Sequence, residues 1–249
     1  MTSNYLKLNE DKTEVIVFSH KPLQDGTLMN SIDIGGHTIK PVSSVRNLGV
    51  ELDSSLTMIP HITKVCKGAF FVLRNLSRIR RYLSSDAAKM LVHSFVSAKL
   101  DYGNALLLGV HKKHLKKLQR VLHSAARVVA MVGRRESITP ILQDLHWLPV
   151  KQRIEYKAIL LCFKGIHAQA PAYLSALVQI YKPTRALRST NHTKVVPPGY
   201  RYERIGAHAF ANSASSLFNA LPENLRDEED IETFKTLLKT HLFKSAYKL

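Results

Sequence analysis

Cysteine is scarce in this sequence, and long apolar runs are missing. The 249 residues include two cysteines, Cys66 and Cys162, without a CxxC motif or a cysteine–histidine spacing that would close a zinc site. We expect both to be buried free thiols. The longest apolar runs, such as residues 158–163, fall far short of the roughly 20 residues that cross a bilayer. The first twenty residues also lack the apolar stretch of a secretory signal, so we expect no membrane contact and an intracellular protein, in the cytoplasm or nucleus.

Short motifs that mark common catalytic sites are missing as well. No GxGxxG, GxxxxGK[ST], GxSxG or HExxH pattern occurs, so no motif supports a nucleotide-binding loop, a hydrolase site or a zincin site. His111 and His114 are three residues apart, but no third ligand stands at a metal-site spacing. Asp101 lacks the second adjacent carboxylate that two-metal phosphoryl transfer uses, so we interpret it as a helix-end or turn residue. We expect no catalytic residue, no metal and no cofactor.

Positive charge is what the sequence has in excess. The formal net charge is +17, in a chain whose 45% apolar and 22% charged residues are typical of a globular protein. Residues 1–60 hold five Lys/Arg against seven Asp/Glu, residues 61–157 nineteen against five, and the remainder twelve against seven. Such a cationic stretch attracts phosphates, which indicates a nucleic-acid partner. The alternative is a solvated basic surface that only keeps the protein soluble.

The first 60 residues predict β structure. The β-branched run 13–18 predicts one strand, and residues 45–52 predict another. Between Ile34 and His37, Gly35-Gly36 predicts a tight hairpin, because glycine tolerates positive φ. So few short strands do not make an independent domain, and we expect them to pack on something else and to expose an apolar face. The side chains expected on that face are Val15, Val17, Ile32 and Ile34.

After His61 the apolar period becomes helical. We expect an α+β fold in which a small β-hairpin region (1–60) precedes a mostly helical bundle (61–181), a linker or long loop (182–205) and a C-terminal helical region (206–249). The acidic run 227–230 fits the N-terminus of the last helix. Thr139 and Pro140 fit an N-cap and a first helical position. The predicted helices span about 61–79, 84–100, 111–131, 139–146, 150–168, 173–180, 207–218 and 231–247.

The helix predicted over 111–131 has a cationic face. At 100° per residue, five of its side chains lie within roughly 40° of a common line, away from the apolar stripe: Lys113, Lys117, Arg120, Ser124 and Arg127. We predict that this face contacts phosphates. The residues proposed for it are Lys113, Lys117, Arg120 and Arg127. The next candidates, off the apolar stripe of the preceding helix at 61–79 or just after it, are Arg74, Arg78 and Arg81.

Several blocks, in order along the chain, resemble the C-terminal part of the reverse transcriptase of non-LTR (LINE-type) retrotransposons, in particular jockey-like elements. The most specific block is residues 138–154, with Trp147-Leu148-Pro149 and Arg153. Gly103 stands where the family commonly has cysteine, and Phe218 where tryptophan is usual. The other blocks are residues 4–18, 47–53, 100–107, 170–174 and 217–240.

The resemblance implies a palm edge and primer grip in residues 1–60 and a thumb in residues 61–181. It assigns the primer-grip-like hairpin to Asn47, Leu48, Gly49 and Val50. The parent family is an RNA-directed DNA polymerase that uses magnesium, held by palm aspartates which would lie upstream of residue 1. We therefore expect a truncated, non-catalytic fragment that misses its upstream palm and fingers and binds RNA or DNA, as duplex or hybrid, independently of sequence.

Another possibility is a structural or protein-interaction module, or a functionless remnant, of a degraded or domesticated retroelement. Charge placement discriminates between these hypotheses. Cations gathered on one concave face favour nucleic-acid binding, whereas an exposed apolar sheet face with scattered cations favours a protein partner.

Overall fold

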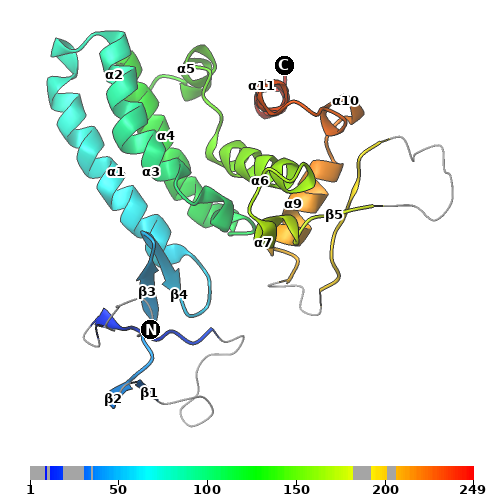
Figure 1. The fold of residues 1–249 in the computed structure, drawn as a ribbon. Coiled ribbons are helices and arrows are strands. Elements are labelled where there is room, and N and C mark those ends of the chain that lie inside the picture. Colours follow the sequence, from blue (N-terminus) through cyan, green and yellow to red (C-terminus); the bar gives the residue numbers. More distant parts are fainter. Residues whose placement is uncertain (1–8, 10–11, 19–30, 35, 182–191, 201–205) are drawn as a thin grey trace. The chain divides into compact units, whose positions relative to one another are not determined.

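The computed structural model describes residues 9, 12–18, 31–34, 36–181, 192–200 and 206–249 (Figure 1). They fall into two compact units, residues 1–64 and 65–249. Short antiparallel strand pairs occupy the first unit and a helical bundle the second, which confirms the predicted α+β class. None of the helices in the described part of the chain combines the length and hydropathy needed to span a bilayer.

The first hairpin lies where the glycine pair predicts it. Strands β1 (Ile32–Ile34) and β2 (His37–Ile39) are antiparallel, with Ile34 opposite His37, which leaves a two-residue connection. Gly36 in that connection has a φ of +88°, a conformation that glycine adopts without a steric penalty. Thr38 Oγ1 donates a hydrogen bond across the hairpin to Asp33 Oδ1.

The strand predicted over residues 13–18 is wrong. In this segment only Val15 pairs, in an isolated bridge to Pro41, with Val42 N donating to Val15 O at 2.8 Å. Pro41 has no N–H, so the neighbouring segment cannot extend the ladder, and β-branched composition alone does not hold a strand. Instead of being exposed, the four side chains expected on an apolar face are partly buried.

The single strand predicted over residues 45–52 is also wrong, because this run is a hairpin. Strand β3 (Ser44–Asn47) pairs antiparallel with β4 (Val50–Asp53), with Asn47 opposite Val50. Leu48 and Gly49 form the turn with φ of +46° and +87°, the pattern of a two-residue hairpin turn with positive φ at both positions. The block likened to a primer-grip hairpin is thus a hairpin.

Helix α1 (Ile59–Ile79) begins after a side-chain cap. Asp53 accepts hydrogen bonds from Thr57 N at 2.9 Å and Met58 N at 2.8 Å, and so satisfies backbone donors just ahead of the helix. In the second unit α1 runs alongside α4 (Lys112–Ala130), as Figure 1 shows. Their apolar stripes are buried, as the helical period predicts. The stripe residues include Ala69 and Leu73 of α1 and Leu118, Leu122 and Val129 of α4.

The second predicted helix is continuous but changes its winding. Ser84 caps α2 (Ser85–Val92) by accepting from Ala87 N at 3.2 Å. A π-helical stretch, η4 (His93–Ser97), then leads into α3 (Ala98–Asp101). Asp101 is the last residue of α3, so its interpretation as a helix-end residue is confirmed. The short 3-10 helices η3 (Arg80–Tyr82) and η5 (Asn104–Leu107) flank this region.

Two short helices differ from their predictions. Helix α5 (Ile138–Asp144) begins two residues earlier than expected, so Thr139 lies inside it and Pro140 in its first turn, where a missing N–H costs little. Helix α6 (Val150–Ile166) is as predicted, but α7 (Ala172–Ser175) stops early. The end of that predicted helix is strand β5 (Gln179–Ile180) instead.

Strand β5 pairs with β6 (Val195–Val196), inside the segment predicted as a long loop. Asn219 holds β6 by donating to Val195 O at 2.7 Å and accepting from Val195 N at 2.9 Å. The loop prediction is therefore wrong for Val195 and Val196, because Asn219, 24 positions after Val195, supplies hydrogen-bond partners to β6. Residues 192–194 and 197–200 are irregular. Residues 182–191 and 201–205 of that prediction lie outside the described residues.

One core joins α6 to the C-terminal helices α9 (Phe210–Asn219), α10 (Glu223–Arg226) and α11 (Ile231–Tyr247). Phe163 stacks on Phe234 with 4.0 Å between ring centroids, and Phe218 is fully buried beside them. Both cysteines are buried and free, as predicted. Helices on both sides of residues 182–205 therefore share one core.

Candidate nucleic-acid interface

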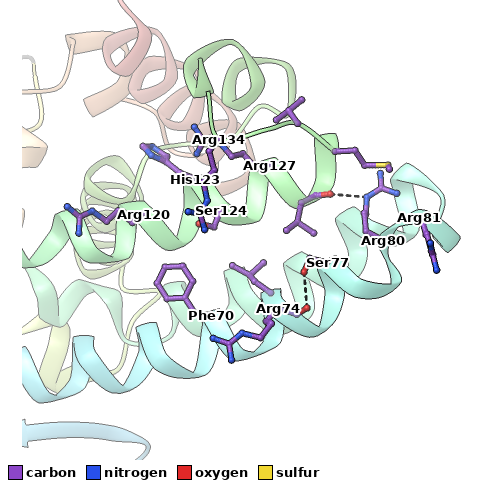
Figure 2. A pocket seen from close by; sticks show the side chains of 14 residues that line it. Phe70, Arg74, Ser77, Arg80, Arg81, Arg120, His123, Ser124, Arg127 and Arg134 are labelled. Atoms are coloured by element: carbon purple, nitrogen blue, oxygen red, sulfur yellow. Dashed lines mark hydrogen bonds between the residues drawn. The ribbon is translucent and has the colours of Figure 1, made fainter. Parts of the chain in front are cut away.

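A groove with a volume of about 1040 Å³ runs between α1 and α4 in the second unit. Figure 2 shows Phe70 and Arg74 of α1 along one side, and Arg120 and Ser124 of α4 along the other. Six of its 14 lining residues are arginines, and none of the 14 is acidic. The arginines are Arg74, Arg80, Arg81, Arg120, Arg127 and Arg134.

The groove follows from the amphipathic pattern of the two helices. Each turns its apolar stripe into the bundle, so the cations one step off that stripe lie beside the seam between the helices. Leu73 and Leu76 of α1 are buried, while Arg74 between them in sequence is exposed. In α4, Leu118 and Val121 are buried and Arg120 is exposed. Helical geometry therefore brings like charges together across the groove.

Arg80 has a structural role at the base of the groove. Its side chain is buried, and its guanidinium donates to Val128 O at 2.9 Å, Val129 O at 2.7 Å and Leu83 O at 2.7 Å. The first two carbonyls belong to the last turn of α4, where carbonyl groups have no N–H partner within the helix. A cation at this end also compensates the helix dipole. Arg80 therefore fixes the end of α4 against η3.

Arg127 is partly used by the protein itself. Its Nε donates to Gly133 O at 3.2 Å, and its Nη2 donates to Glu136 O at 3.3 Å. Glu136 in turn accepts from Gly133 N at 3.2 Å through Oε1. These bonds hold the turn after α4 and leave fewer guanidinium donors for a ligand. Arg127 lies in the predicted interface, but its main contacts are structural.

The remaining four arginines present their charge to solvent. All are exposed, and no carboxylate of the described residues forms an ion pair with any of them. Arg81 lies over the ring of Tyr82, with 4.7 Å between Cζ and the ring centroid. No carboxylate in the described part of the second unit neutralises these cations, which makes the groove electropositive. They are Arg74, Arg81, Arg120 and Arg134.

The structure brings four of the seven predicted binding residues to this groove: Arg74, Arg81, Arg120 and Arg127. Lys113, Lys117 and Arg78 are exposed but do not line it. Arg80 and Arg134 line the groove without having been predicted from the sequence. The adjacent pair Arg134-Arg135 was a visible signal, but helical periodicity does not place residues beyond the end of a helix.

His123 lies among these arginines without adding to their charge. Burial lowers its pKa, and nearby Arg127 lowers it further, which favours the neutral ring. Gln119 Oε1 accepts from Val150 N at 2.8 Å, so its amide nitrogen faces His123 Nε2 at 2.7 Å. The amide therefore donates to Nε2, and the ring carries its proton on Nδ1.

Apolar side chains interrupt the basic lining. Phe70 is 39% exposed and Met131 is 62% exposed, and both line the groove. Phe71, the next residue of α1, is 63% exposed but lies outside the groove. Phe70 therefore offers an aromatic face within reach of the cations.

The primer-grip-like residues lie in the first unit. Asn47 and Val50 are paired in the β3–β4 hairpin, and Leu48 at its tip is 85% exposed. Leu48 has a positive φ, which is uncommon for a residue with a bulky side chain and places this residue in the turn. Lys64 forms an ion pair with Glu51 next to the hairpin, with 2.5 Å between Nζ and Oε2.

No group of three or more His, Cys, Asp or Glu side chains that could hold a metal ion occurs within the described ranges. His111 instead caps α4, accepting from Lys113 N at 3.2 Å through Nδ1. Its ring lies 6.4 Å from that of His114, centroid to centroid. His111 of the pair noted in the sequence thus has a capping role.

Comparison of this chain with protein-family models, curated proteins and solved structures gave no match.

Proposed function

We propose that this chain binds RNA or DNA through phosphate contacts in the groove between α1 and α4. One observation carries the proposal: four exposed arginines line a concave surface without a carboxylate partner among the described residues. Cations that meet phosphates release condensed counterions, which favours binding to any polynucleotide. No side chain of the groove is held in a way that selects a base edge, so we expect binding without sequence preference.

The sequence blocks give this proposal its context. Their likeness to non-LTR retrotransposon reverse transcriptases suggests that the second unit is a thumb-like region and that the first carries the palm edge and primer grip. If the chain derives from such a reverse transcriptase, its natural partner is an RNA–DNA hybrid or duplex, in the cytoplasm or nucleus. The gathering of cations in one groove favours nucleic-acid binding over the alternative, a protein-interaction module or functionless remnant.

We further propose that the chain does not polymerise nucleotides by itself. Asp101, the residue most similar to a polymerase carboxylate, is paired with Arg153, with 2.5 Å between Oδ2 and Nη1. A carboxylate held in this way serves the packing of α3 on α6. Primer extension with magnesium and nucleotides should stay at the level of a blank, and extension that disappears in Asp101→Asn would contradict this.

The groove is tested by fluorescence anisotropy with a labelled RNA–DNA hybrid over a range of salt concentrations. Log affinity falls as log salt rises, and each lost phosphate contact should reduce the magnitude of that negative slope by about 0.9. Arg74→Gln combined with Arg120→Gln should therefore make the slope shallower by up to about 2. Hybrids of unrelated sequence should be affected alike.

A matched control is Lys164→Gln combined with Lys244→Gln, on α6 and α11, which removes the same charge away from the groove. We expect this pair to retain the parent slope apart from a small long-range effect. Equal losses in both double variants would mean that only net charge matters. No binding by the parent chain would favour a protein partner.

A further inference from the structure

A second concave site is lined by bundle elements that carry the family-like blocks. It is a cavity of about 370 Å³, a volume in the range of small-ligand sites. Asp101 and Asn104 reach it from one block, and Trp147 and Arg153 from another about 45 residues later in the chain. None of these residues lines the groove between α1 and α4.

Part of the cavity wall is a closed hydrogen-bond network. Arg153 pairs with Asp101 and donates from Nε to Leu148 O at 3.0 Å. Asn104 directs its amide nitrogen toward Asp101 Oδ1 at 3.4 Å and Arg153 O at 3.5 Å. Because both neighbours are acceptors, this orientation of the amide is the favoured one. The network fixes the wall before any ligand arrives.

Asn104 keeps one polar atom without a partner. The residue is 3% exposed, and its Oδ1 is buried and accepts no hydrogen bond from any described residue. A buried acceptor left unpaired costs free energy, so an occupant with an N–H or O–H donor would be stabilised here. The ring of His93, edge-on to Trp147 at 5.3 Å between centroids, lies in the same lining.

Two lysines give the cavity an excess of positive charge. Lys157 of α6 and Lys239 of α11 line it, are exposed and form no ion pair within the described residues. Since Asp101 balances Arg153, the two lysines are the uncompensated charges of the lining when both of its histidines, His93 and His146, are neutral. Burial lowers the pKa of His93, and Arg153 and Lys239 lower it further against the opposing effect of Asp101, so neutrality is favoured.

We propose that this cavity binds a phosphate monoester that also carries a hydroxyl or amino donor. The charge of such a group near neutral pH, about −1.5 to −2, matches the two unpaired lysines. Its donor would satisfy Asn104 Oδ1, and Lys157 and Lys239 would contact the phosphate. Two sources share this chemistry: a free nucleoside monophosphate, and the 5′-phosphorylated end of a nucleic-acid strand.

Titration calorimetry of the full chain with AMP tests the site. We expect saturable binding that weakens by about tenfold for each of Lys157→Gln and Lys239→Gln, because each removes a charge-assisted hydrogen bond. Lys164→Gln combined with Lys244→Gln, on the same helices but outside the cavity, should leave AMP affinity unchanged. The groove variant Arg120→Gln should leave it unchanged too, which separates this result from the proposed function.

The pKa of His93 supplies a readout that is independent of calorimetry. A bound phosphate dianion should raise the His93 pKa measured by NMR, against the effects of Arg153, Lys157 and Lys239. If a 5′-phosphorylated oligonucleotide competes with AMP and the same oligonucleotide with a 5′-hydroxyl does not, the natural ligand is a strand end. If AMP binds and neither oligonucleotide competes, the natural ligand is a free nucleotide. No saturable AMP or 5′-phosphate binding, or equal losses in the cavity and control variants, would overturn the proposal.

Discussion

Arg80 and Arg120 line the same groove, but their surroundings give them different roles. Arg80 is 9% exposed and bonds three backbone carbonyls, whereas Arg120 is exposed and pairs with no carboxylate of the described residues. A buried guanidinium is retained because its donors are satisfied, and removing it leaves carbonyls without partners. The identity of a residue therefore does not say whether it binds a ligand or the chain itself.

Arg80→Gln should lower the free energy of unfolding by about 2–4 kcal/mol, because the C-terminal carbonyls of α4 lose their charged donors. Urea denaturation followed by circular dichroism measures this. Exposed Arg81→Gln is the control and should change the free energy by less than about 0.5 kcal/mol. A change in Arg80→Gln as small as that of the control would show that solvent replaces the three bonds.

At the scale of the element, α1 shows how one helix serves two surfaces. Its buried stripe holds Ala69 and Leu73, and the residues next to that stripe line the groove. Phe70 and Phe71 are adjacent in sequence, but 100° of rotation places only Phe70 in the groove. The two form a natural matched pair for asking whether the groove accepts unpaired bases.

Phe70→Ala should weaken binding of a single-stranded oligonucleotide by about 1–3 kcal/mol if a base stacks on the ring, and it should affect a blunt duplex much less. Phe71→Ala, which removes an equally large exposed ring, should change neither affinity. Anisotropy with both labelled ligands measures the contrast. Equal effects of the two substitutions would show that Phe70 is not a stacking platform.

At the scale of the whole second unit, long-range packing around α6 decides which side chains are shielded from solvent. Cys162 lies in the core that α6 shares with α9 and α11, and burial raises its thiol pKa to about 12. Cys66 is buried in α1, and burial raises its pKa against the opposite effect of Lys117. Both thiols therefore stay protonated near neutral pH.

Native Cys162 should resist alkylation at pH 8, because only about 10⁻⁴ of it is thiolate and the reagent cannot enter the core. The Cys66→Ser variant isolates this thiol, and mass spectrometry follows its labelling by iodoacetamide. Stability should fall as pH rises above the ordinary thiol pKa of 9.0, since the unfolded chain then loses the proton first. Labelling at the rate of a free thiol would mean that the core opens locally.

The sequence by itself determined the features that depend on neighbouring residues. The 3.6-residue period predicted α1, α4, α6 and α11, the second helix begins where predicted, next to Ser84, which caps it, and the glycine pair correctly predicted the first hairpin. These signals act within a turn or two of the chain, so a local pattern is enough to read them. The excess of Lys and Arg in residues 61–157 is likewise a property of the sequence alone.

Only the tertiary structure decided what those elements do together. Pairing of β5 with β6 depends on Asn219, and the end of α4 depends on Arg80, 48 residues before Val128. The period of α4 put Arg120 and Arg127 on one line, yet only packing showed that Arg127 bonds its own turn and that Arg74 of α1 lines the same groove as Arg120. Contacts between distant residues leave no periodic trace, because they are fixed by how the helices pack.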